Sequence, residues 1–95
     1  MNTRLPIDFD PAKDLVNQSK HGVSLANARS FEFETALTVV DDRADYGERR
    51  EIAIGYVGDR LHVLVFTVRT ETIRVISLRK ANNREVRTYE QNTED

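Results

Sequence analysis

The sequence predicts an α+β domain, with helices placed before and after a mostly antiparallel β-sheet. The clearest signal is residues 61–81, where two runs rich in β-branched residues and free of Gly and Pro flank a short polar turn. Helix-start signals stand on both sides of the strand-rich region, at Asp10-Pro11 and at Asn82 with Glu85 three residues later. The chain therefore combines two N-terminal helices, a sheet and one C-terminal helix.

Residues 61–69 predict the central strand of the sheet. They are apolar on both faces as far as Val68, which is typical of a strand that is covered on both sides. A polar turn at residues 70–72 leads into a second, antiparallel strand over residues 73–79. Apolar and polar residues alternate there, so one face is expected to carry Ile73, Val75, Ser77 and Arg79.

The N-terminal third predicts a short strand and two helices. Ile7 and Phe9 form an extended lead-in, and Asp10 caps a helix that is expected to end near Gly22. A second, short helix follows Ser24, which can act as its N-cap. The apolar residues expected on these two helices are Ala12, Leu15, Val16, Leu25, Ala28 and Phe31.

Two more strands are predicted between the helices and the hairpin, over residues 36–40 and 50–57, with a polar loop between them. Gly58 and Asp59 provide a tight turn into the hairpin. The final helix is expected over residues 83–90.

The chain as a whole, residues 1–95, has the length of one domain with a modest core. Residues 91–95 are predicted to fray. No stretch approaches the ~18 consecutive apolar residues of a membrane span, and the N-terminus lacks a signal-peptide pattern, so a cytoplasmic protein is expected. There is no cysteine, and the two histidines lie far apart, which argues against a metal site. We expect no cofactor.

Charge is distributed unevenly along the chain, although the net charge is only −2. Residues 1–42 hold four basic and seven acidic side chains, whereas residues 43–87 hold ten basic and six acidic ones. Positive charge is thus concentrated on the predicted strands and the last helix. Local charge, more than the total, indicates which partners a surface can bind.

Several cations stand where predicted elements begin or end. Cleavage of RNA needs little more than such groups, because guanidinium and ammonium groups stabilise the charge that develops when the 2′-hydroxyl attacks phosphorus. A histidine can exchange the protons near neutral pH, and Glu48 is a second candidate for that role. The cations at element ends are Lys20, His21, Arg50, Arg69, Arg79 and Lys80.

Structural roles are alternatives for the same residues. Lys20 and His21 lie in the last helical turn, where positive charge complements the helix dipole. Arg69 and Arg79 could instead pair with a carboxylate such as Glu48 or Asp41. Arg84 and Arg87 on the final helix are either solvated or contact a phosphate backbone.

Five short motifs resemble, in order and spacing, the BrnT family of bacterial type II toxins. They are KHGVS at residues 20–24, GERREIAIG at 47–55, TVR at 67–69, SLRKA at 77–81 and YE at 89–90. The opening Phe9-Asp10-Pro11 with Lys13 also resembles that family, so the similarity covers residues 7–90.

The resemblance implies a RelE-like ribonuclease toxin that inhibits translation by cleaving RNA without a metal. It also implies a cognate antitoxin of the BrnA type, a ribbon-helix-helix protein, whose complex with the toxin binds operator DNA. Catalytic positions implied by the motifs are Lys20, His21, Glu48, Arg50, Arg69 and Arg79. Further RNA-binding positions are expected at Arg49, Lys80, Arg84 and Arg87.

Two positions depart from the family pattern. Glu51 stands where the family usually has an aromatic residue, and Leu78 where it usually has alanine. Neither change removes a cation, but Glu51 lowers the local potential and leaves open whether Arg49 or Arg50 contacts phosphate.

Three functional classes follow from the sequence. The first is the endoribonuclease toxin. The second is a non-catalytic inhibitor that binds RNA or the ribosome through the same basic surface. The third is an inactive toxin homologue that binds its partner and acts as a co-repressor.

Overall fold

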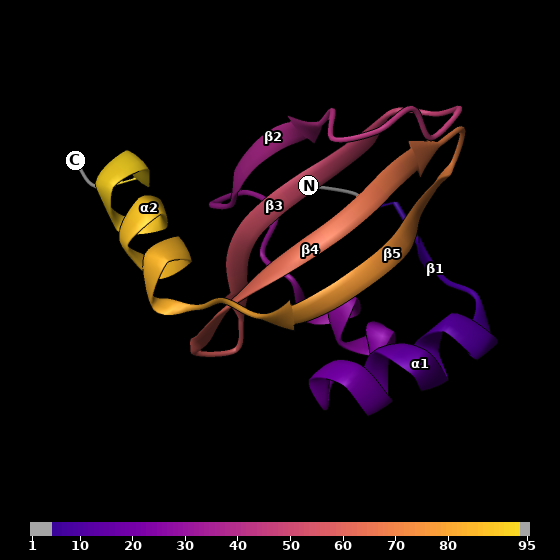
Figure 1. Cartoon of the computed structure of the whole chain (residues 1–95), viewed down its shortest axis with the longest axis horizontal. Coiled ribbons are helices and arrows are strands. Elements are labelled where there is room, and N and C mark those ends of the chain that lie inside the picture. Colours follow the sequence, from indigo (N-terminus) through magenta and orange to yellow (C-terminus); the bar gives the residue numbers. More distant parts are fainter. Residues whose placement is uncertain (1–4, 94–95) are drawn as a thin grey trace.

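Five β-strands form one sheet in the computed structural model, which describes residues 5–93 (Figure 1). The order is β1-β5-β4-β3-β2, and all neighbouring strands are antiparallel except β1 and β5, which are parallel. The predicted α+β class with a mostly antiparallel sheet is therefore confirmed. The strands are β1 (Ile7–Asp8), β2 (Leu37–Asp41), β3 (Arg50–Val57), β4 (Arg60–Arg69) and β5 (Thr72–Lys80).

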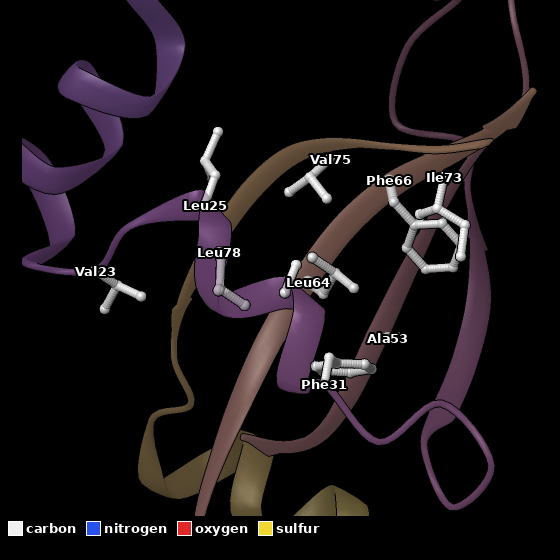
Figure 2. Packing of buried hydrophobic residues seen from close by; sticks show 10 residues of the cluster. Val23, Leu25, Phe31, Ala53, Leu64, Phe66, Ile73, Val75 and Leu78 are labelled. Carbon is white, nitrogen blue, oxygen red and sulfur yellow. The ribbon is translucent and has the colours of Figure 1, made fainter. Parts of the chain in front are cut away.

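β4 lies at the centre of the sheet, and residues 61–67 are all buried. Helical segments cover both of its faces. On one face, Leu64 and Phe66 pack with Leu25 and Phe31 in the larger core cluster (Figure 2). On the other face, Leu61 and Val63 pack with Ala81, Tyr89 and Val86 in a smaller cluster. The prediction of a central strand covered on both sides is confirmed.

The N-terminal helical segments are α1 (Pro11–His21) and η1 (Leu25–Ser30). The Asp10 carboxylate accepts the Ala12 N–H at 2.8 Å, and Gly22 ends α1 with φ of +69°. Both predicted caps are confirmed, as is the Ser24 cap of η1. The second segment is a 3₁₀-helix, however; its buried residues Leu25 and Ala28, and the buried Phe31 directly after it, follow the three-residue repeat of that helix.

β5 contains a bulge that overturns the predicted alternation along this strand. Val65 of β4 pairs with Ser77, but the next residue, Phe66, pairs with Val75, so Ile76 is an extra residue. Beyond the bulge the side chains change faces: Leu78 joins the core with Val75, whereas Ser77 and Arg79 point to the opposite face. Simple alternation cannot predict an inserted residue.

α1 attaches to the sheet through a polar residue. β1 pairs only with Ile73 and Arg74, which leaves the edge of β5 unpaired further along the strand. There the buried Asn17 amide donates to the Leu78 carbonyl at 2.7 Å and accepts the Leu78 N–H at 3.3 Å. It also donates to the Val23 carbonyl at 2.8 Å. Asn17 thus completes the sheet edge where β1 ends.

The apolar residues of α1 do not enter the core, contrary to the pattern expected of an amphipathic helix. Leu15 is 69% exposed and Val16 is 56% exposed. The reason is that α1 contacts the protein through Asp14 and Asn17, which satisfy backbone and hydroxyl groups. Its apolar side therefore faces solvent.

The C-terminal helix α2 (Asn83–Thr93) begins with the predicted capping box. The Asn82 side chain accepts the Glu85 N–H, and the Glu85 carboxylate accepts the Asn82 N–H, both at 2.9 Å. The helix continues past the predicted end at residue 90 and includes residues 91–93. Asn92 and Thr93 side chains bond back to the carbonyls one turn earlier. The rest of the predicted tail, residues 94–95, lies outside the described residues.

None of the helices in the described part of the chain is long and apolar enough to cross a membrane.

Candidate functional site

A surface pocket of about 310 Å³ lies between α1 and the sheet. We call it the basic pocket. Its walls come from the exposed end of α1, the bulge of β5 and the first residue of β3. The described residues around it are Lys13, Val16, Asn17, Lys20, His21, Arg50, Ile76 and Ser77. Three of these carry a permanent positive charge and none is acidic, so the pocket attracts anions.

Lys20 and His21 reach the basic pocket because of two constraints on α1. Gly22 ends the helix directly after His21, and Asn17 fixes the preceding turn to β5. The predicted position of both residues in the last helical turn is confirmed. The fold also brings Arg50 to this pocket, although Arg50 comes thirty residues after Lys20 in the sequence.

Arg50 is held in place by stacking and burial. Its guanidinium carbon lies 3.9 Å from the centroid of the Tyr46 ring, a close cation–π contact. Its Nε is enclosed and has no hydrogen-bond partner among the described residues. An enclosed, unpaired N–H is costly, which makes this guanidinium a candidate to bind an anion.

The loop that carries Tyr46 is anchored at its start by Asp41. The Arg43 guanidinium donates two hydrogen bonds to the buried Asp41 carboxylate, at 2.7 and 2.8 Å. These bonds, together with the Arg43 N–H and a smaller contribution from Tyr46, lower the pKa of Asp41 from 3.8 to about 2. The same pair raises the pKa of Arg43. Asp41 and Arg50 also lie opposite each other in the backbone register of the antiparallel strands β2 and β3.

Arg69, the last residue of β4, forms an ion pair with Glu48. Arg69 Nη2 lies 3.5 Å from Glu48 Oε1. Their side chains are 51% and 35% exposed, so the pair is loose and contributes little stability. The predicted alternative of a carboxylate partner for Arg69 is thus confirmed. Neither residue is among those around the basic pocket.

Arg79 is held more firmly than Arg69. Its partner is Glu85, for which the sequence predicts only a role in helix capping. Its guanidinium donates to both Glu85 carboxylate oxygens, at 2.8 and 2.7 Å. The hydrogen bonds raise the pKa of Arg79 and lower the pKa of Glu85. Glu85 therefore connects the end of β5 to the first turn of α2. Arg79 points to the same face of the sheet as Ser77, but it is held at the start of α2 by Glu85 and is not among the residues that line the basic pocket.

The remaining predicted cations lie outside the basic pocket. Arg49, Lys80 and Arg84 are exposed. Arg87 lines a separate open pocket of about 500 Å³ on α2, together with Glu90, Gln91 and Thr93. Between Arg49 and Arg50, only Arg50 is part of the basic pocket, and Arg49 serves the fold through its carbonyl, which accepts the Thr67 hydroxyl at 2.7 Å.

Three residues near the site were not among the predicted positions: Lys13, Tyr46 and Ser77. Lys13 had a usable signal, because residues seven apart share a helix face and Lys20 was already a candidate. Tyr46 and Ser77 had none, since one lies in an irregular loop and the other is placed by the bulge.

The arrangement suits one chemical task well. Two lysines and an arginine at one pocket can hold a phosphate group, and the arginine is already oriented by an aromatic ring. His21, an exposed imidazole beside these cations, can accept or donate a proton. Fold and pocket together define a small α+β protein with a cationic surface pocket whose charges suit a phosphate group.

The chain belongs to the BrnT family, since the family described as ribonuclease toxin, BrnT, of type II toxin-antitoxin system matches residues 9–85. Among solved structures, the chain is similar to the Brucella abortus ribonuclease toxin, BrnT. The two are 30% identical with a TM-score of 0.64, and the match covers 84% of this chain and 100% of that one. No curated protein matches the sequence. The predicted membership of the BrnT family is thereby confirmed.

Proposed function

We propose that this chain is a metal-independent endoribonuclease toxin that cleaves RNA at the basic pocket. The observation that carries the proposal is the grouping of Lys20, His21 and Arg50 around one pocket lined by no carboxylate. Arg50 and Lys20 hold the scissile phosphate and stabilise its transition state. The RNA 2′-hydroxyl gives up its proton as its oxygen attacks phosphorus, and the 5′-oxygen takes up a proton as its bond to phosphorus breaks. His21 transfers one of these two protons, and Lys20 or Glu48 transfers the other.

Other predicted residues take supporting roles in this proposal. The loose Arg69–Glu48 pair can open to offer a second cation and a carboxylate for proton transfer. Arg79 reaches a phosphate only after it leaves Glu85. Arg49, Lys80, Arg84 and Arg87 contact the RNA backbone from the surrounding surface.

The biological setting belongs to the same proposal. RNA cleavage in the cytoplasm inhibits translation, in the RelE-like manner that the resemblance implies. A BrnA-type ribbon-helix-helix antitoxin neutralises the toxin, and the complex binds operator DNA. The whole chain, residues 1–95, acts as one toxin domain.

The purified chain tests the catalytic part of the proposal directly. We expect RNA cleavage that persists in the presence of a chelator, and a loss of about 10²-fold or more in rate for Lys20→Gln, His21→Gln and Arg50→Gln. Arg74→Gln is the matched control, since Arg74 pairs with Asp8 away from the pocket. Cleavage that a chelator abolishes would refute metal independence.

Induction of the chain in growing cells separates the alternatives. Growth arrest with fragmented RNA, relieved by Arg69→Ala or Arg79→Ala, supports the toxin and its wider set of catalytic residues. Arrest with intact RNA indicates the non-catalytic inhibitor. Unimpaired growth, with the antitoxin still bound, indicates the inactive co-repressor.

A further inference from the structure

α1 is an amphipathic helix whose orientation is the reverse of the usual one. Its inward contacts are made by Asp14 and Asn17, and its apolar side chains Leu15 and Val16 are 69% and 56% exposed. The polar inward side is explained by the sheet edge that Asn17 completes. Nothing in the fold of the described residues covers the two aliphatic side chains.

We propose that this outer face of α1 is the docking surface for the antitoxin, and that the docking segment is both apolar and acidic. Covering largely exposed Leu and Val side chains removes apolar area from water, so Leu15 and Val16 together offer an anchor for a partner. The partner is a protein and not RNA, because aliphatic side chains give nucleic acid bases no aromatic platform on which to stack.

The charge around the anchor determines the second property of the segment. Lys13 and Lys20, three residues before and four residues after Val16, flank Val16 on the same helix, and His21 lines the basic pocket with them. The acidic residue of this helix, Asp14, is turned inward, where it accepts the Leu25 N–H at 2.7 Å. The face presented to a partner is therefore apolar and positive, which an acidic, apolar segment complements.

Docking at this place also has a functional consequence, which rests on the function proposed above. Val16 is part of both the exposed face of α1 and the wall of the basic pocket. A segment that buries Val16 therefore lies at the mouth of the basic pocket and places its carboxylates beside Lys20 and Arg50. It neutralises the toxin by occupying the place of the phosphate.

The test measures binding of the antitoxin encoded with this chain to purified variants, by calorimetry. Leu15→Glu changes an exposed residue outside the basic pocket and is expected to leave the unfolding midpoint and RNA cleavage unchanged. It should weaken antitoxin binding by at least about tenfold. The matched control is Val39→Glu on the edge strand β2, where the valine is 56% exposed, against 69% for Leu15; the affinity of this variant should equal that of the wild type.

The outcomes are distinct. Unchanged affinity for Leu15→Glu, or a loss confined to Val39→Glu, overturns the docking surface, and so does the absence of any antitoxin binding. Affinity that does not fall as salt is raised overturns the acidic character of the segment. Binding that is lost in Leu15→Glu while the wild type cleaves no RNA supports the docking surface and rejects the proposed catalytic function.

Discussion

Arg50 shows how three features within ten residues of sequence orient one side chain. It begins β3, its neighbour across the ladder is Asp41, and its guanidinium lies against the ring of Tyr46 in the preceding loop. The stacked ring limits the guanidinium to one plane while its terminal N–H groups stay available for an anion. Tyr46 is in this sense a positioning residue for Arg50.

Replacing Tyr46 separates the ring from its hydroxyl. Tyr46→Ala removes a cation–π contact of about 0.5–2 kcal/mol and should slow RNA cleavage by about 2- to 30-fold. Tyr46→Phe keeps the ring and should retain most of the wild-type rate. Single-turnover cleavage at saturating protein is the measurement. Equal losses in the two variants would show that the hydroxyl, and not the stack, is what matters.

Asp41 gives stability a defined pH dependence. Its folded pKa of about 2 lies below the ordinary value of 3.8, because Arg43 binds the ionised form. The stabilisation is therefore fully present above about pH 4 and is lost as the pH falls toward 2. We expect Asp41→Asn to lower the urea midpoint near neutral pH and to match the wild type near pH 2. Asp42→Asn, in the exposed part of the loop, is the control.

Residue-scale features differ in how far the sequence alone predicts them. The caps at Asp10, Gly22 and Ser24 were predicted correctly, because each depends on groups within a few residues. The partners of Arg50 and Arg79 were not predicted. One is a loop aromatic and the other a helix-capping glutamate, and neither contact follows the spacing of a regular helix or strand.

At the scale of elements, the attachment of α1 to β5 positions Lys20 and His21. Asn17 makes three hydrogen bonds to backbone groups of Leu78 and Val23, all buried. Asn17→Ala should leave those groups without partners and lower the free energy of unfolding by about 2–4 kcal/mol. Urea unfolding measures the loss. Gln18→Ala should lower the free energy of unfolding much less, because the Gln18 side chain makes an exposed hydrogen bond to Asp14.

The elements themselves follow from periodicity, whereas their irregularities do not. Strands β2 to β5 lie within about two residues of their predicted ranges, since β-branched runs and turn residues mark them. The bulge at Ile76 depends on how β5 fits β4 and leaves no local mark. It nevertheless decides that Ser77 reaches the basic pocket and that Arg79 turns toward α2.

At the scale of the whole molecule, a net charge of −2 predicts repulsion from RNA, but the charge is not uniform. Lys13, Lys20 and Arg50 meet at one pocket, and Asp14 beside them is occupied by backbone and hydroxyl donors. Over distances longer than the Debye length of about 10 Å in ~0.1 M salt, the acidic remainder is screened. RNA near the basic pocket therefore experiences a positive field.

That local field predicts how affinity responds to salt. For single-stranded RNA the logarithm of the binding constant should fall linearly with the logarithm of salt concentration, by about 0.7 for each phosphate neutralised. Lys20→Gln should reduce the slope by about 0.7, because one fewer counterion is released. Arg74→Gln should leave it unchanged, since Arg74 already pairs with Asp8 of the edge strand β1 at 2.6 Å and does not line the basic pocket. Fluorescence anisotropy with a non-cleavable oligonucleotide that lacks 2′-hydroxyls measures both slopes. A slope that is the same in the wild type and in Lys20→Gln would mean that RNA binds elsewhere on the surface. The assignment of the scissile phosphate to the basic pocket would then be wrong.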